Sequence, residues 1–161
     1  MRFKQPIKGE ASIEIQAPPD VLYRLISDVT RMGEWSPECT GGKWLGGATG
    51  PAVGARFKGT NENRFSWSTS SRIVTADEGR SFIFERDRPR GFGVMRWSYL
   101  LEPAPSGTRV TESFEQVRTA PTLAILAANL TTGVPWNDRE AVNITNMQTT
   151  LKRLKEKAET G

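Results

Sequence analysis

The hydrophobic pattern of this chain changes its period once, and that change limits the folds that the chain can adopt. Through most of the first 117 residues, apolar side chains recur at every second position in short runs, as in half-buried β-strands. Beyond residue 137 they recur at every third or fourth position, at Ile144, Met147, Leu151 and Leu154, as on one face of an α-helix. The chain therefore has to pair several strands and cover their sheet with one long helix.

Turn-forming residues separate the alternating runs, which favours pairing between successive strands in an antiparallel meander. We predict strands over residues 10–16, 43–45, 55–61, 66–75, 81–86, 94–101 and 108–117. Two short helices, over residues 21–28 and 30–35, are expected after the first strand. The fold class is then α+β: a curved antiparallel sheet of about 6–7 strands wrapped around a long C-terminal helix. A pocket is expected wherever that helix does not fill the concave face.

The long helix is expected to begin near Asn137 and Asp138, because Asn and Asp cap helix N-termini and a break at residues 133–135 precedes them. Ala141 and Ala158 extend its apolar stripe at the two ends. The segment 119–129 is mildly apolar and favours a further short helix. We expect residues 123–130 to pack over the opening of the sheet.

Composition and charge exclude several classes of protein. A chain of 161 residues predicts a single domain over residues 1–161. With one Cys and no His, an internal disulfide and most zinc or triad enzymes are excluded. The net charge of +4 arises from Lys and Arg spread along the chain, so no nucleic-acid partner is expected. No apolar run approaches the roughly 20 residues of a membrane span, and the first residues lack the apolar core of a secretion signal, which favours a cytoplasmic location.

Glycine spacing gives no indication of a cofactor site. Six glycines lie between residues 41 and 54, but they fit neither the dinucleotide-binding fingerprint nor the phosphate-binding loop. We interpret this stretch as a flexible loop beside a cavity, around the short strand at 43–45. We expect no metal and no cofactor.

A set of short motifs follows the predicted elements in a characteristic order. They are residues 28–29 (DV), 34–38 (EWSPE), 54–59 (GARFKG) with Asn61, 97–99 (WSY), 101–103 (LEP), 107–113 (GTRVTES) and 150–154 (TLKRL). Together they resemble the START-like (SRPBCC) superfamily, in its polyketide cyclase/dehydrase-like branch, from about residue 10 to residue 157. The resemblance implies a helix-grip fold with an internal hydrophobic cavity. Members include lipid and hormone carriers, aromatase/cyclases and co-chaperones, so the shared fold does not by itself assign an activity.

Strand parity indicates which side chains face the cavity, because alternate residues of a strand point to the same face. If the apolar residues point inward, four polar ones point inward with them. Trp35 is added because the resemblance places it at the cavity wall, where we expect it at the rim. The candidate ligand-binding residues are Trp35, Phe57, Asn61, Trp67, Thr69, Trp97, Tyr99, Glu112, Phe114 and Met147. The aromatic members are also compatible with an ordinary core.

Glu112 and Tyr99 are the candidates for chemistry. A carboxylate on the concave side has to be paired, hydrogen-bonded or protonated through a raised pKa. Two alternatives stay open for Glu112. In the first, the strand register differs by one residue and Glu112 is exposed. In the second, Glu112 forms a structural ion pair with Arg56, Arg72 or Arg96. Tyr99 is either a core tyrosine or a residue that holds a ligand carbonyl.

Three functions fit these observations. The first is a carrier or shield that binds a hydrophobic small molecule, such as a lipid, isoprenoid or polyketide, in the cavity. The second is a polyketide cyclase or dehydratase in which polar cavity residues move protons. The third is a co-chaperone-like interaction module that uses the surface of residues 123–130. Ionisable cavity groups with shifted pKa values would favour the enzyme, and a smooth apolar cavity would favour the carrier. We expect the carrier, with an undetermined oligomeric state.

Overall fold

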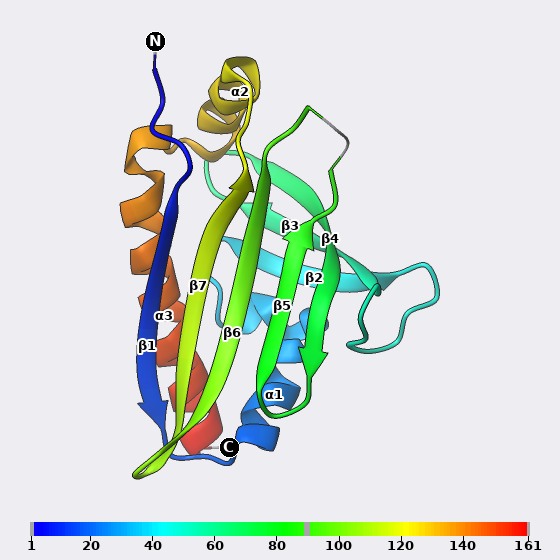
Figure 1. Cartoon of the computed structure of the whole chain (residues 1–161), viewed down its shortest axis with the longest axis vertical. Coiled ribbons are helices and arrows are strands. Elements are labelled where there is room, and N and C mark those ends of the chain that lie inside the picture. The colour runs from blue at the N-terminus through cyan, green and yellow to red at the C-terminus, as the bar shows by residue number, and fades with distance from the viewer. Residues whose placement is uncertain (1, 89–90, 161) are drawn as a thin grey trace.

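A single antiparallel sheet forms the body of the molecule in the computed structural model, which describes residues 2–88 and 91–160 (Figure 1). Its seven strands follow the order β1-β7-β6-β5-β4-β3-β2, so each strand from β2 to β7 pairs with its neighbour in the chain and β1 closes on β7. The strands are β1 (Lys8–Ile15), β2 (Cys39–Leu45), β3 (Arg56–Glu62), β4 (Ser66–Asp77), β5 (Ser81–Arg86), β6 (Val94–Ala104) and β7 (Gly107–Arg118). The predicted α+β helix-grip fold is confirmed.

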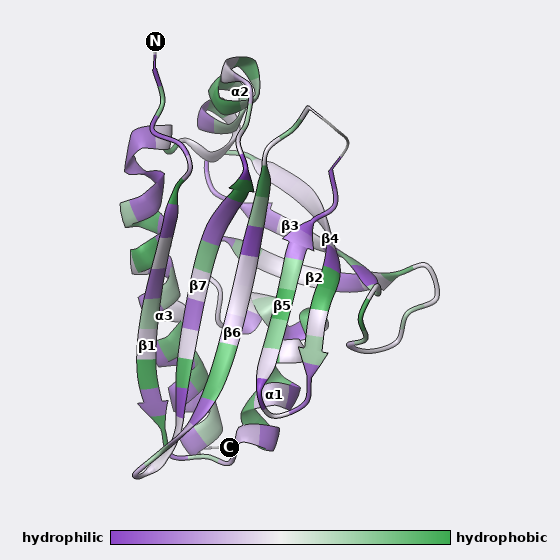
Figure 2. Cartoon of the chain, in the orientation of Figure 1, coloured by the Kyte–Doolittle hydropathy of each residue, from purple (hydrophilic) through white to green (hydrophobic). Residues whose placement is uncertain are grey.

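Helices cover the concave face of this sheet. The elements are α1 (Pro19–Ser27), the 3-10 helix η1 (Val29–Glu34), α2 (Thr122–Thr132), the 3-10 helix η2 (Trp136–Asp138) and α3 (Arg139–Thr160). The long helix α3 runs along β1, whereas α2 lies at the end of the sheet where β7 finishes (Figure 1). In β7 hydrophobic and hydrophilic bands alternate, as expected for a strand with one buried face (Figure 2).

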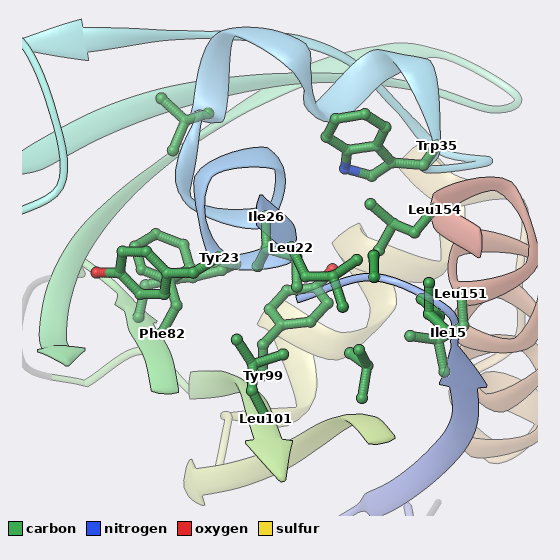
Figure 3. Close-up of a cluster of buried hydrophobic side chains, with 14 of the residues drawn as sticks. Ile15, Leu22, Tyr23, Ile26, Trp35, Phe82, Tyr99, Leu101, Leu151 and Leu154 are labelled. Atoms are coloured by element: carbon green, nitrogen blue, oxygen red, sulfur yellow. The ribbon is translucent and has the colours of Figure 1, made fainter. Parts of the chain in front are cut away.

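A hydrophobic core fills one half of the space between the sheet and the helices. Leu22 and Ile26 of α1 meet Leu151 and Leu154 of α3 there (Figure 3). Ile15 of β1 packs among them and is fully buried. Aromatic and aliphatic side chains of the sheet complete this core: Phe57, Ile73, Phe82, Phe84, Tyr99, Leu101 and Val110.

Strand β2 is longer than the sequence predicts, because it already includes two of the glycines that we assigned to a loop. A Cβ atom on Gly42 would lie 2.4 Å from the carbonyl oxygen of Val29. The absence of a side chain therefore lets η1 pack directly against β2. Only the remainder of the glycine-rich stretch, residues 46–55, connects β2 to β3.

The inward face of α3 is less apolar than its sequence pattern indicates. Ala141, which we placed on the apolar stripe, is exposed, while Asn143 and Thr150 are buried. The predicted capping residues Asn137 and Asp138 belong to η2, and α3 begins one residue later. Asn143, Met147 and Thr150 line a cavity, so polar residues that we did not place on the stripe also lie on the inward face of α3.

Helix α2 lies at the opening of this cavity, and only one side of it is covered. Ile125 is buried, and Ala128 and Thr132 line the cavity. Leu123 and Leu130 remain 80% and 63% exposed. Residues 123–130 therefore pack over the opening as expected with one face of α2, while the other face is exposed.

Candidate functional site

A cavity of about 260 Å³ lies between the concave face of the sheet and the helices, beside the core. The sheet forms its floor, α3 and η1 form its sides, and the C-terminal half of α2 lies across one end. Of the candidate residues named from the sequence, Trp35, Phe57, Asn61, Trp67, Thr69, Trp97, Tyr99, Glu112 and Met147 line this cavity. Strand parity brings the seven strand residues of this set together on the floor of the cavity, while Trp35 after η1 and Met147 on α3 reach it from the sides.

Phe114 is the candidate that does not reach the cavity. Its side chain is 1% exposed and packs with Ile7 and Met147 in a small cluster beneath β1. Its ring lies 5.5 Å from that of Trp97, centroid to centroid. Ile7 and Met147 pack against Phe114, which is not among the residues that line the cavity, so the prediction that Phe114 lines it is wrong.

Trp35 lines the cavity but does not lie at an exposed rim. Its side chain is 3% exposed and belongs to the main core (Figure 3). The guanidinium of Arg31 lies 5.4 Å from its ring centroid, on the solvent side, and Arg153 donates a 3.4 Å hydrogen bond to its carbonyl oxygen. The expectation of a rim position is wrong, because η1 packs tightly against β2 and carries Trp35 inward.

Glu112 points into the cavity from the middle of β7. It lies opposite Tyr99 of β6, whose hydroxyl donates a 3.0 Å hydrogen bond to Glu112 Oε1. The other oxygen, Oε2, is buried and has no hydrogen-bond partner among the described residues. Burial raises the pKa of Glu112 to about 8, and the hydrogen bond from Tyr99 partly offsets this rise. Burial, followed by the charge of Glu112, raises the pKa of Tyr99 well above its usual value.

Both alternatives that the sequence leaves open for Glu112 are absent here. The register of β7 turns its side chain inward, since Glu112 is 5% exposed. Arg56 forms an ion pair with Asp87, and Arg96 forms one with Glu85. Glu112 is therefore a buried acid whose raised pKa favours the protonated form at neutral pH, and its Oε2 has no partner among the described residues.

Arg86 is a cavity residue that the sequence analysis did not identify. It shares its strand parity with Phe82 and Phe84, and this parity was the signal that would have found it. Its Nε atom is buried without a hydrogen-bond partner in the part of the chain that the structure describes. Burial lowers the pKa of Arg86 to about 10, with a smaller contribution from the positive charge of Arg88.

A polar cluster joins α3 to the start of β2 at the side of the cavity. Arg139 Nη1 donates a 2.6 Å hydrogen bond to Glu38 Oε1, and Asn146 Nδ2 donates one of 2.9 Å to the same oxygen. Arg139 also contacts Asn143 Oδ1 at 3.3 Å. Sequence analysis did not find this cluster, because its members come from a loop and a helix and share no periodicity. It fixes the helix that forms the side of the cavity.

The ionisable groups do not form a metal site. Among residues 2–88 and 91–160, no three His, Cys, Asp or Glu side chains lie close enough together to hold an ion. Cys39 lines the cavity as a free thiol, and burial raises its pKa, which disfavours the reactive thiolate. In the same part of the chain, no helix is long and apolar enough to cross a membrane.

A helix-grip sheet around a cavity with inward polar groups is the architecture of a class of small-molecule-binding domains. Comparison with protein families identifies the branch. Residues 6–159 match the family described as polyketide cyclase / dehydrase and lipid transport, and the chain belongs to this family. A comparison with curated proteins found no match.

Solved structures share the fold over nearly the whole chain. The Polyketide_cyc-like protein Cgl2372 from Corynebacterium glutamicum is 31% identical, with a TM-score of 0.63 over 97% of this chain and 94% of that one. A START superfamily protein from Mycobacterium smegmatis is 15% identical, with a TM-score of 0.71 over 96% and 98% of the two chains. The di-domain ARO/CYC StfQ from the steffimycin biosynthetic pathway is 14% identical, with a TM-score of 0.71 over 95% of this chain and 50% of StfQ. The last two show likeness of fold alone.

Proposed function

We propose that this protein binds a hydrophobic small molecule with polar substituents, such as an aromatic polyketide, isoprenoid or lipid, and carries or shields it. The observation that supports this is a cavity with aromatic walls and a few convergent polar groups, which is typical of small-molecule sites. Four tryptophans line the cavity: Trp35, Trp67, Trp97 and Trp136. Membership of a family described by cyclases and lipid transport agrees with such a ligand.

A cavity-filling variant tests this proposal. Thr69 lies on the cavity wall beside Gly59, so Thr69→Trp places an indole in the space that a ligand would occupy. Thr60→Trp is the matched control, because Thr60 is exposed on the strand next to that of Thr69. We expect the neutral fluorophore N-phenyl-1-naphthylamine to bind the parent and Thr60→Trp at one site, and Thr69→Trp to lose this binding. Equal binding by all three would place the site outside the cavity.

A second candidate, a cyclase- or dehydratase-like enzyme, is favoured by the pair formed by Glu112 and Tyr99. The cavity is not smooth and apolar, since it holds an acid with a raised pKa and a free oxygen. A protonated carboxyl group of this kind is suited to donate a proton to a carbonyl or a departing hydroxyl group of a bound substrate. In this role Glu112 acts as general acid and Tyr99 holds it in place through Oε1.

The candidate enzyme activity has its own test. With a reactive poly-β-ketone thioester mimic as substrate, we expect Glu112→Gln to retain binding and to lose acceleration of ring closure. Tyr99→Phe is expected to retain part of the acceleration, because it removes a positioning bond and not the proton donor. Binding without acceleration by the parent protein would leave the carrier as the function.

A further inference from the structure

We propose that the cavity selects ligands that carry an anionic group, a carboxylate or an enolate, bound by Arg86, together with a hydroxyl or carbonyl group bound by Glu112. This inference rests on the proposed binding function and specifies its ligand class. The two polar atoms that lack partners and face the same cavity are Arg86 Nε and Glu112 Oε2. Buried polar atoms are nearly always hydrogen-bonded, so two orphans on one cavity wall indicate positions for ligand atoms.

Among residues 2–88 and 91–160, no carboxylate forms an ion pair with Arg86. Its two sequence neighbours are acidic, but Glu85 forms an ion pair with Arg96, and Asp87 forms one with Arg56 at 2.7 Å. The strand direction explains this separation, because alternate residues of β5 point to opposite faces of the sheet. The side-chain charge that affects the pKa of Arg86 is that of Arg88, which is also positive. An anion from outside the chain is the partner that this environment lacks.

The position of Arg86 is accessible to a ligand from two directions. It lines the main cavity and also a second hollow of about 320 Å³ beneath α2. The two hollows share Trp67, Met95 and Trp136 around this arginine. A guanidinium at such a junction can receive a carboxylate in bidentate geometry while the apolar body of the ligand lies against the aromatic wall.

The separation of the two orphan atoms sets the shape of the ligand. Glu112 is in register with Tyr99, which in turn is opposite Phe82 of β5, and Arg86 lies four residues further along β5. Four residues along a strand span roughly 13 Å, and the two strand spacings from β5 to β7 add roughly 10 Å across the sheet, so the two Cα atoms lie on the order of 16 Å apart. Both side chains extend into the cavity from these positions, so a two-ring ligand with polar groups at opposite ends is the expected match. A protonated Glu112 would donate from Oε2 to the hydroxyl or carbonyl oxygen.

Matched probes test this inference by isothermal titration calorimetry. The probes are 6-hydroxy-2-naphthoate, its neutral methyl ester, and 2-naphthoate, which lacks the hydroxyl group. We expect Arg86→Met to weaken binding of the two acids roughly 10- to 100-fold, as expected for a charge-assisted bond, and to leave the ester nearly unchanged. Arg86→Lys should restore part of the affinity for the acids. Glu112→Leu, which removes the donor, should weaken binding of 6-hydroxy-2-naphthoate more than binding of 2-naphthoate, whereas Glu112→Gln, whose amide still donates, should not.

The controls separate this inference from the proposed function. Arg72→Met removes one exposed positive charge from the neighbouring strand and should change none of these affinities. Arg86→Met should melt no lower than the parent, because it removes a buried charge without a partner. If Arg86→Met weakens the binding of the acids and of the ester equally, or leaves both unchanged, the anion site is refuted while binding in the cavity stands. If the parent binds none of the probes and no N-phenyl-1-naphthylamine, the proposed function fails.

Discussion

Glu112 shows how the fold sets the chemistry of a single side chain. The same residue on the outer face of β7 would be exposed to water, as Glu115 is. Glu112 points inward, where Tyr99 and apolar side chains replace water around its carboxyl group, and this burial raises its pKa to about 8. A buried acid of this kind makes the free energy of unfolding of the whole protein depend on pH.

We predict that the stability of the protein falls as the pH rises through the range set by Glu112. The pKa of Glu112 is 4.5 in the unfolded chain and about 8 in the folded one. Between these values the unfolded chain has lost a proton that the folded chain retains, so the free energy of unfolding decreases with rising pH. Urea unfolding at pH 5 and pH 8 should show a loss on the order of a few kcal/mol.

Glu112→Gln is the control, because Gln has the same shape, still accepts the hydrogen bond from Tyr99 and does not titrate. We expect this variant to lack the component of the pH dependence that lies between pH 4.5 and 8. A parent protein and a Gln variant with parallel stability profiles would show that Glu112 is not a buried, protonated acid.

Tyr99→Phe should move the same transition upward. Its hydroxyl hydrogen bond favours the ionised form of Glu112, so removal of that bond raises the pKa of Glu112 further. The carboxyl ¹³C resonance of Glu112, followed by NMR across a pH titration, measures this directly. A titration midpoint that falls in Tyr99→Phe would contradict the assigned direction of the bond's effect.

At the scale of elements, the contact between η1 and β2 positions Trp35 against the cavity. Gly42 permits that contact, since its Cβ would lie 2.4 Å from the Val29 carbonyl oxygen. We predict that Gly42→Ala destabilises the protein by about 1–3 kcal/mol through this overlap. Chemical denaturation monitored by tryptophan fluorescence gives the value.

Gly41→Ala is a matched control from the same strand. The nearest atom to its added Cβ is Thr60 Oγ1 at 3.6 Å, an ordinary contact. We expect its free energy of unfolding to stay within about 0.5 kcal/mol of the parent value. Equal losses in both variants would mean that a general cost of Ala in β2, and not the approach of η1, determines the effect.

Helix α3 is held to the sheet by its apolar C-terminal half. Leu151 is 1% exposed in the core, so Leu151→Asp buries an unpaired charge. We predict a loss of about 4 kcal/mol or more, enough to unfold a domain of ordinary stability. Lys152→Asp, at the exposed neighbouring position, should retain the native circular dichroism spectrum. A folded Leu151→Asp variant would contradict the packing of α3 in the sheet.

At the scale of the whole molecule, the order of elements follows from the hydrophobic periods, and so does much of the cavity wall. Residues on strands were predictable because a period of two assigns each side chain to a face, as it did for Trp67 and Thr69. Phe114 has the correct parity and lies opposite Trp97 on the adjacent strand, but it packs against Ile7 and Met147, and parity carries no information on which elements pack over a side chain.

The polar side of the cavity was harder to predict, for a physical reason. Strand parity placed four polar residues in the cavity, but it was not extended to Arg86, and the helical period selected only the apolar residues of α3. Arg86 and Asn143 point inward although neither is apolar. Glu38 joins them from a loop, where no periodicity exists to place it. The contact between Glu38 and Arg139 depends on how α3 sits on the sheet, which no local pattern encodes.

The five tryptophans report directly on whether a ligand enters this cavity. Trp35, Trp67, Trp97 and Trp136 line it, whereas Trp44 packs outside it against Phe57. In a ¹H–¹⁵N correlation spectrum, their indole signals should be recorded during titration with N-phenyl-1-naphthylamine. We predict that the four cavity signals shift and saturate together while the Trp44 signal stays in place. No shift at saturating ligand, or a shift largest at Trp44, would contradict ligand binding in the cavity.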